Sequence, residues 1–222
     1  MVIAIDGTGC SGKSTVAKKL AKRIGFLYLN TGAIYRAVAF VCNQNGVESG
    51  DIKGIEALLK TIKYEQLVGQ NGEMVVEVNG KDVTAELYSP LIGNLSAVYS
   101  PIPIVREFVK SIQHQIADKT NSVVEGRDVG TVVFPQAEVK FFVTASTEIR
   151  ARRRMKDFAE QGKQISFEQV LRDIEERDER DMTRKISPLK QAEDAILLMN
   201  DFDSPEPAVD IMEKAVKEKI KI

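Results

Sequence analysis

Cysteine and histidine are scarce in this chain, which narrows the chemistry open to it. The 222 residues include two cysteines, Cys10 and Cys42, and a single histidine, His114. Two cysteines, one of them inside a glycine-rich loop, argue against a disulfide scaffold and fit a reducing cytoplasm. Because histidine and cysteine form no cluster, neither a transition-metal site nor Ser-His catalysis has support.

Long apolar runs and an excess of one charge are missing as well. No apolar run approaches the roughly 20 residues that a membrane-spanning helix needs, and the opening "MVIAID" lacks the positive residues of a signal peptide. The formal net charge is −1, with 28% charged and 43% hydrophobic residues. This balance is ordinary for a soluble globular protein and points neither to nucleic acid nor to a membrane surface. We expect a cytoplasmic, monomeric protein that binds neither.

The most specific motif present is a phosphate-binding loop. The segment "GTGCSGKST" matches the pattern G-x-x-x-x-G-K-[ST] through Gly7, Gly12, Lys13 and Ser14. It follows the β-rich run "VIAID" and precedes the helical run "KSTVAKKLAKRIG", which is the context that the motif requires; a fortuitous glycine turn is the weaker alternative. The residues predicted to bind ATP are Gly7, Thr8, Gly9, Cys10, Ser11, Gly12, Lys13, Ser14 and Thr15. Of these, Lys13 is expected to reach the β- and γ-phosphates, and the Ser14 hydroxyl to bind Mg²⁺.

Further apolar runs predict a parallel α/β sheet. Buried strands are expected at residues 122–125, 139–144 and 195–199, and helices at Glu148 to Gln161 and Phe167 to Met182. Strands that alternate with helices are typical of a three-layer sandwich around a parallel sheet, here of the P-loop type.

One segment breaks this alternation. Residues Lys63 to Thr84 contain the pairs Asn71-Gly72 and Asn79-Gly80, each between strand-like residues. Asn-Gly favours tight hairpin turns, so we expect a small antiparallel sheet inserted into the α/β core. The predicted boundaries are 1–35 and 119–222 for the core and 36–118 for the insert.

Arginine is concentrated in the last third of the chain. Twelve arginines are present, and eight of them lie between Arg150 and Arg184. Arg150, Arg153 and Arg154 fall at i, i+3 and i+4 and share one helix face. The planar guanidinium suits bidentate binding of phosphate, so this face is a candidate phosphate clamp.

A second arginine face follows on the next predicted helix. Arg177, Asp181 and Arg184 fall at i, i+4 and i+7. The segment "RDIEERDERD" is also rich in acids, and a solvated face with i, i+4 ion pairs is an equal alternative. We prefer that alternative for Arg172 and Arg180.

Two strand ends carry further candidates. In "VVEGRDVGTVVFP", a buried strand ends before Arg127 and Asp128, and ligands of open α/β sheets bind beyond the carboxyl ends of strands. Arg127 can clamp a phosphate and Asp128 can accept from a base amino group; a turn-stabilising ion pair is the alternative. In "LNTGAIYRAV", Thr31, Gly32 and Arg36 lie at a strand end and a helix start, where a plain helix cap is the alternative.

These segments together resemble the bacterial-type cytidylate kinases over nearly the full length of the chain. The matching blocks are "GTGCSGKST", "NTGAIYRAVA", "VNGKDVT", "EGRDVGTVVFP", "TEIRARRRM" and "ERDERDMTRKISPLKQAEDAI". The resemblance implies a nucleoside monophosphate kinase with a parallel-sheet core, an acceptor-binding insert and a short arginine-rich lid at about 150–170. Its implied reaction transfers the γ-phosphoryl group of ATP to CMP or dCMP with Mg²⁺, in line and without a covalent intermediate.

The family pattern also implies roles for individual residues. Lys13, Arg150, Arg153 and Arg154 would act on the transferring phosphoryl group. The CMP site would comprise Thr31, Arg36, Ser96, Arg106, Arg127, Asp128, Arg177, Asp181 and Arg184. Within it, Arg36, Arg127 and Arg184 would hold the monophosphate, Arg177 and Asp181 would meet the sugar, and Ser96, Arg106 and Asp128 would read the cytosine.

The sequence departs from the family pattern at three places. Asn30 and Glu125 stand where the family usually has aspartate, and the run between Ser96 and Arg106 is one residue longer. Other acceptors, such as UMP, AMP or shikimate, stay open, although the insert argues against shikimate. A regulatory P-loop switch is the alternative outside enzymes, but the chain has no Asn-Lys-x-Asp guanine signature.

Overall fold

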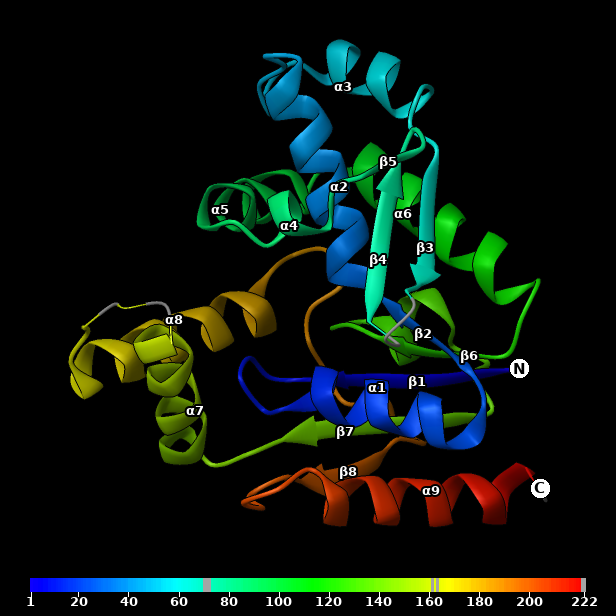
Figure 1. Cartoon of the computed structure of the whole chain (residues 1–222), viewed down its shortest axis with the longest axis vertical. Helices are drawn as coiled ribbons and strands as arrows, with labels where there is room; N and C mark the ends of the chain where they lie inside the picture. The colour runs from blue at the N-terminus through cyan, green and yellow to red at the C-terminus, as the bar shows by residue number, and fades with distance from the viewer. Residues whose placement is uncertain (70–72, 161, 163, 221–222) are drawn as a thin grey trace. The chain divides into compact units, whose positions relative to one another are not determined.

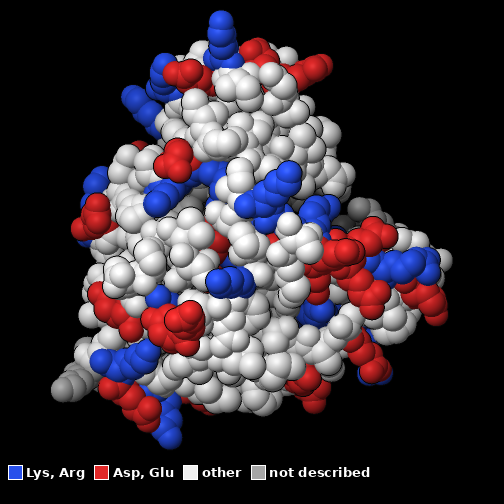
Figure 2. Space-filling model, turned by 180° about the vertical axis from the view of Figure 1, so that it is seen from behind, with Lys and Arg blue, Asp and Glu red and all other residues white. Residues whose placement is uncertain are grey.

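The computed structural model describes residues 1–69, 73–160, 162 and 164–220. The chain forms two compact units (Figure 1). Unit 1 combines Met1–Tyr28 with Thr120–Ile222, and unit 2 is Leu29–Lys119. Among the described residues, no helix is both long enough and apolar enough to cross a membrane. On the face shown in Figure 2, lysine and arginine side chains are interspersed with aspartate and glutamate.

Unit 1 is built on a five-stranded sheet, although the last two residues of one edge strand, Leu29 and Asn30, are assigned to unit 2. The strand order is β2-β6-β1-β7-β8, and β1 pairs in parallel with β6 and β7, as β7 does with β8. The strands are β1 (Val2–Gly7), β2 (Leu27–Asn30), β6 (Ser122–Glu125), β7 (Val139–Thr144) and β8 (Ile196–Met199). The prediction of a parallel α/β sheet is confirmed, with β6 and β7 at the expected residues.

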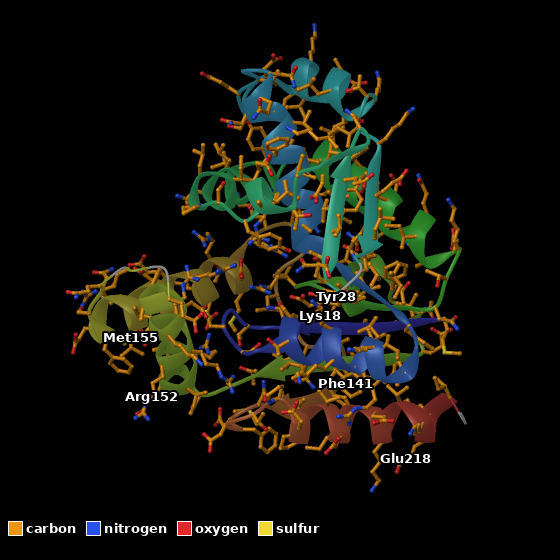
Figure 3. All side chains as sticks on the ribbon, viewed as in Figure 1. Lys18, Tyr28, Phe141, Arg152, Met155 and Glu218 are labelled. Atoms are coloured by element: carbon orange, nitrogen blue, oxygen red, sulfur yellow. The ribbon has the colours of Figure 1, made fainter. Side chains whose placement is uncertain are left out.

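Apolar side chains from both sheet and helices form the core of unit 1. Helices α1 (Lys13–Ile24) and α9 (Glu206–Ile220) pack together against the sheet (Figure 1). Phe141, labelled in Figure 3, is 1% exposed. The buried members of the cluster are Ile3, Ile5, Val16, Ala17, Leu20, Ala21, Val123, Val139, Phe141, Val143, Leu198, Ala208, Val209, Met212 and Val216. Strands buried in this way read as near-continuous apolar runs, which is why they could be located in the sequence.

Helices α7 (Thr147–Glu160) and α8 (Phe167–Thr183) have a small core of their own. Ala151, Val170 and Ile174 are buried between them, with Phe158 packed alongside. Both predicted helices are confirmed, although Gln161 lies outside the described residues. A short π-helical turn, η1 (Val129–Val133), follows β6 and was not expected from the sequence.

Unit 2 is mainly helical, with a separate antiparallel sheet of order β3-β4-β5. Its elements are α2 (Thr31–Gln44), α3 (Ile52–Leu59), β3 (Tyr64–Val68), β4 (Met74–Val78), β5 (Lys81–Asp82), α4 (Thr84–Leu87), α5 (Pro90–Tyr99) and α6 (Pro103–Ala117). The predicted turn at Asn79 and Gly80 joins β4 to β5 with φ values of 54° and 76°. Both values are positive, as a type I′ hairpin turn requires. The pair Asn71-Gly72 lies outside the described residues.

Candidate active site

The phosphate loop connects β1 to α1 at the carboxyl end of the sheet. Gly7 has φ 154°, and a Cβ there would lie 1.8 Å from the carbonyl oxygen of Val143, so only glycine fits this close approach of β1 to β7. Helix α1 begins at Lys13, after Gly12 with φ 79°, and no described side chain caps it. Its first backbone N–H groups are therefore available to an anion at the positive end of the helix.

Three side chains from outside the loop hold two of its backbone carbonyls, Gly9 O and Ser11 O. Arg150 Nη1 donates to Gly9 O at 3.3 Å, and Arg153 Nη1 donates to Ser11 O at 3.1 Å. Asn200 Nδ2 donates to the same Ser11 oxygen at 2.7 Å. Carbonyls fixed in this way cannot turn toward a phosphate and repel it, which keeps the loop suited to anions.

Lys13 is a buried cation in the loop, 5% exposed. Its Nζ donates to Thr8 O at 3.2 Å and lies 3.8 Å from Glu125 Oε1. Burial lowers the pKa of Lys13 to about 7, and Arg127 acts in the same direction, whereas Glu125 raises the pKa. A polyanion bound beside Lys13 would reverse this shift.

Glu125 and Ser14 form an oxygen-rich pair beside Lys13. Ser14 Oγ donates to Glu125 Oε1 at 2.9 Å, and the Tyr28 hydroxyl donates to Glu125 Oε2 at 2.6 Å. In the part of the chain that the structure describes, no three His, Cys, Asp or Glu residues form a metal-binding group. Mg²⁺ at nucleotide sites takes one or two protein oxygens plus phosphates and water, so a hydroxyl with a neighbouring carboxylate fits it.

The residues after β6 meet the end of α8. Arg127 Nε donates to Asp181 Oδ2 at 3.0 Å, and Asp128, 7% exposed, lies with its Oδ1 3.7 Å from Arg184 Nη2. Arg127 thus faces Asp181 and Asp128 faces Arg184, and both partners lie at the carboxyl end of α8. Arg184 Nη2 is a buried donor that makes no hydrogen bond within the described chain.

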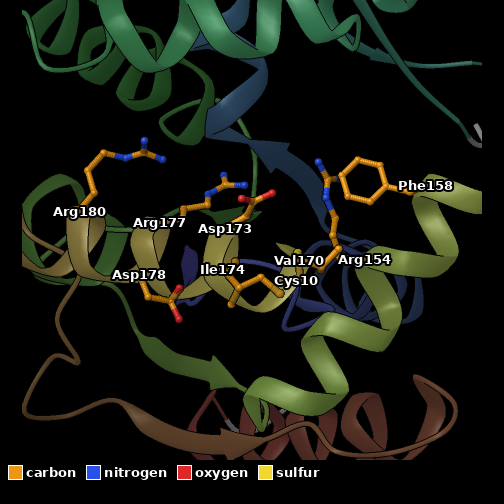
Figure 4. Close-up of a pocket in the computed structure, with 10 residues that line it drawn as sticks. Cys10, Arg154, Phe158, Val170, Asp173, Ile174, Arg177, Asp178 and Arg180 are labelled. Carbon is orange, nitrogen blue, oxygen red and sulfur yellow. The ribbon is translucent and has the colours of Figure 1, made fainter. Parts of the chain in front are cut away.

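A pocket of about 160 Å³ lies between the phosphate loop and helices α7 and α8 (Figure 4). Cys10, Arg154 and Arg177 line it together with the apolar side chains of Phe158, Val170 and Ile174. The Arg154 guanidinium lies 4.3 Å from the centre of the Phe158 ring. Asp173 and Asp178 also line the pocket, so cationic, acidic and apolar groups converge beside the phosphate loop.

The eight arginines of this segment divide into two groups. Arg152 pairs with Glu148 on the outer side of α7 (Figure 3), with 68% of its side chain exposed. Arg172 is exposed and bonds Gln169 at 3.0 Å. Arg180 is exposed, although it also lines the pocket. The second group contacts the phosphate loop, lines the pocket or faces Asp128, and comprises Arg150, Arg153, Arg154, Arg177 and Arg184.

The remaining CMP-site candidates lie on helices of unit 2. Thr31 is the first residue of α2, and the Asn30 side chain caps that helix by accepting from Ala33 N at 3.2 Å. The Arg36 guanidinium lies 5.1 Å from the Tyr88 ring centre, and its buried Nε finds no hydrogen-bond acceptor among the described residues.

The other two unit 2 candidates lie on α5 and α6. The Arg106 guanidinium lies 5.9 Å from the Tyr35 ring centre. Ser96 Oγ donates to Gly93 O within α5 at 2.8 Å.

Comparison with known proteins identifies the family. The family model described as cytidylate kinase matches residues 3–218. A cytidylate kinase of Carboxydothermus hydrogenoformans is 46% identical over 198 residues, which is 89% of each chain. One of Clostridium botulinum is 43% identical over 94% of each chain, and one of Thermotoga maritima is 42% identical over 98% of this chain and 97% of its own. This chain belongs to the cytidylate kinase family.

The fold of this cytidylate kinase family member also occurs in a solved structure. An uncharacterized protein from Eubacterium ventriosum superimposes with a TM-score of 0.54, 12% identity and 98% coverage of both chains. At that identity the likeness concerns the fold alone.

Three side chains of this cytidylate kinase family member were not singled out from the sequence. Asp6 accepts two backbone N–H bonds from the turn after β6, Tyr28 bonds Glu125, and Asn200 bonds the phosphate loop. Only Asp6 carried a signal, because it stands directly before the glycine motif. Asn200 lies 189 residues from its partner Ser11, so no local pattern could reveal that contact.

Proposed function

We propose that this protein transfers the γ-phosphoryl group of ATP to CMP or dCMP, giving ADP and CDP or dCDP. The observation that supports this most directly is a set of buried cationic groups left partly unsatisfied. Lys13 has a depressed pKa in the phosphate loop, and Arg184 Nη2 and Arg36 Nε are buried donors without hydrogen-bond acceptors in the described chain. Such groups are costly unless an anionic substrate completes them. Membership of the cytidylate kinase family supports the choice of nucleotides.

On this proposal, the donor occupies the phosphate loop of unit 1. Backbone N–H groups of residues 7–15 hold the ATP phosphates, and Lys13 reaches the β- and γ-phosphates. Ser14 and Glu125 would hold Mg²⁺, which when bound offsets the negative charge of the phosphates. Arg150 and Arg153 hold the loop carbonyls away from this charge.

On the same proposal, arginine side chains hold most of the acceptor nucleotide. Arg36, Arg127 and Arg184 hold its monophosphate, and Arg177 and Asp181 meet the sugar. An oxygen of the CMP phosphate attacks the γ-phosphorus in line, a new P–O bond forms, and the bond to the β-phosphate oxygen breaks to release ADP. Positioning and charge stabilisation carry the reaction, so no strong base is needed. Asp128 accepts from the cytosine amino group, with Ser96 and Arg106 beside the base.

The proposed roles of the chain segments follow the boundaries predicted from the sequence. Residues 1–35 and 119–222 form the donor-binding core, 36–118 bind the acceptor, and about 150–170 form a lid that limits access of water. We expect the protein to act as a cytoplasmic monomer.

A coupled assay of ADP release tests the proposal. Purified protein is supplied with Mg²⁺, ATP and, in turn, CMP, dCMP, UMP, AMP or GMP. We expect CMP and dCMP to give the highest kcat/KM. Equal rates with all acceptors, or no ADP release with CMP, would contradict the proposal.

A further inference from the structure

The turn after β6 does not use its own aspartate as a cap. Asp128 occupies the N-cap position of η1 with φ −142°, yet its side chain makes no capping hydrogen bond. An aspartate at an N-cap usually accepts from the N–H groups of the first turn. Here the Asp128 carboxylate points instead toward Arg184, 3.7 Å away.

A residue near the start of the chain, 123 positions before Val129, satisfies this turn. Asp6, near the end of β1 and 4% exposed, accepts from Val129 N through Oδ1 at 2.8 Å and from Gly130 N through Oδ2 at 2.7 Å. Two bonds from two consecutive N–H groups fix both the position and the direction of the turn. Because Asp6 directly precedes Gly7, the same strand end supports the phosphate loop and the turn.

Burying the Asp6 carboxylate costs free energy, which is unfavourable for a residue that only caps a turn. Burial raises the pKa of Asp6 to about 6 even though both backbone bonds lower it, so the ionised carboxylate is disfavoured in this position. Asp128 also raises that pKa, whereas Arg127 lowers it. An N-cap side chain accepts from the second or third N–H of the turn, so Asp128 could not satisfy Val129 N, which directly follows it. Asp6 satisfies that N–H and holds the backbone directly after Asp128.

We propose that Asp6 is a positioning residue for base selection: by holding Val129 and Gly130, it fixes the backbone from which the Asp128 carboxylate meets the cytosine. The inference rests on the proposed function, since it concerns how the same site distinguishes CMP from UMP. It adds a residue that touches neither substrate.

The test compares Asp6→Asn with the wild-type protein. Asparagine has the same shape, but it offers one acceptor and turns an amide donor toward the second N–H. We expect kcat/KM for CMP to fall at least ~10-fold, the equivalent of about 1.4 kcal/mol, with a smaller change for UMP, so that the CMP/UMP ratio drops. The KM for ATP should stay within about twofold, since the phosphate loop keeps its own anchors.

A double variant separates positioning from general damage. If Asp6 acts through Asp128, then Asp6→Asn should change the CMP/UMP ratio by less than about twofold once Asp128→Asn is already present. Ser122→Ala is the matched control, because it removes a hydrogen bond of a buried side chain, from Ser122 Oγ to Thr120 O, at the far end of β6. This control should leave the ratio unchanged.

Hydrogen exchange supplies a readout that does not depend on turnover. Because asparagine keeps a single acceptor, the amide of Val129 or of Gly130 should exchange at least ~10-fold faster in Asp6→Asn than in the wild-type protein. An unchanged CMP/UMP ratio in Asp6→Asn, additive effects in the double variant or unchanged exchange would each overturn the inference while leaving CMP kinase activity intact. Absence of CMP turnover in the wild-type protein would instead overturn the proposed function, and the base-selection role with it.

Discussion

At the scale of single residues, Lys13 shows how an anion site is prepared in the absence of the anion. Its ammonium is buried, and its nearest carboxylate, Glu125 at 3.8 Å, also accepts from Ser14 and Tyr28. The low pKa of about 7 follows from burial first and from Arg127 second. The fold thus lowers the pKa of Lys13, and bound phosphates would raise it again.

Binding of ATP should therefore be coupled to proton uptake by Lys13. At pH 8 the free side chain, with a pKa of about 7, is mostly neutral, and nearby phosphates favour its charged form. We expect uptake approaching one proton per ATP at pH 8, and an affinity for ATP that weakens as the pH rises above 7. Calorimetric titrations in Tris and in HEPES would measure this uptake as a difference in heat.

The matched control is Lys13→Arg, whose guanidinium stays charged at every pH used and should show no such uptake. Identical heats for the wild-type protein in the two buffers would contradict a neutral Lys13.

Asp128 provides the second residue-scale prediction. An ionised carboxylate only accepts hydrogen bonds, so it should accept from the cytosine N4 amino group and repel the uracil O4. A mismatched buried pair costs about 1–3 kcal/mol, which corresponds to roughly 5- to 150-fold in preference. Asp128→Asn should therefore lower kcat/KM for CMP and change that for UMP less, which steady-state kinetics with both substrates would show.

The competing explanation is that Asp128 only orients Arg184, which it faces at 3.7 Å. In that case, both substrates would lose efficiency equally in Asp128→Asn, and the ratio would stay constant.

At the scale of elements, two neighbouring arginines of α7 make different contacts. Arg153 donates to three backbone carbonyls, Ser11 O at 3.1 Å and Asn200 O and Phe202 O at 2.9 Å each. Arg154 lies over Phe158 and 3.9 Å from Asp157 in the same helix. The Arg153 guanidinium is thus held by three hydrogen bonds to the backbone. The Arg154 guanidinium contacts residues of its own helix and can change partners when the substrates bind.

Replacing each arginine separately should give two different kinetic patterns. Arg153→Ala should raise the KM for ATP and lower the melting temperature, because Asn200 O and Phe202 O lose this donor and Ser11 O loses one of its two donors. Arg154→Ala should keep the melting temperature and lower kcat by ~100-fold, as expected for a contact made only in the transition state. Thermal unfolding and steady-state kinetics on both variants measure this; matching profiles would contradict it.

The elements also show where sequence patterns succeed. β6 and β7 were located because strands buried on both faces are apolar throughout. The turn η1 was missed because a single π-helical turn has no repeating pattern, and its cap, Asp6, stands 123 residues away from Val129 in the chain. The pairing of Arg127 with Asp181 spans 54 residues and was likewise not visible.

At the scale of the whole molecule, the central question is how water is kept from acting as the acceptor. Water is always present, so a kinase of this design must gain its rate from an oriented acceptor rather than from an activated nucleophile. The lid proposed for residues 150–170 and the acceptor-binding residues 36–118 would act together in this.

ADP release without CMP should therefore be at least ~100-fold slower than with saturating CMP, because water lacks the binding contacts that align an acceptor. The coupled assay measures both rates on one sample. Cytidine, which has the base and sugar but no phosphate, is the control and should not raise the rate. Comparable rates with and without CMP would show an ATPase rather than a monophosphate kinase.

The sequence by itself determined the phosphate loop, the parallel sheet, the Asn79-Gly80 turn and the family, because each depends on local spacing or on residue types within one segment. Only the tertiary structure decided which charges meet. Arg150 and Arg153 lie against the phosphate loop, Arg127 pairs with Asp181, and Asp6 holds the turn after β6. The physical reason is that strand order brings distant chain segments to one edge of the sheet, and a charged side chain takes the partner that is near in space rather than the one near in sequence.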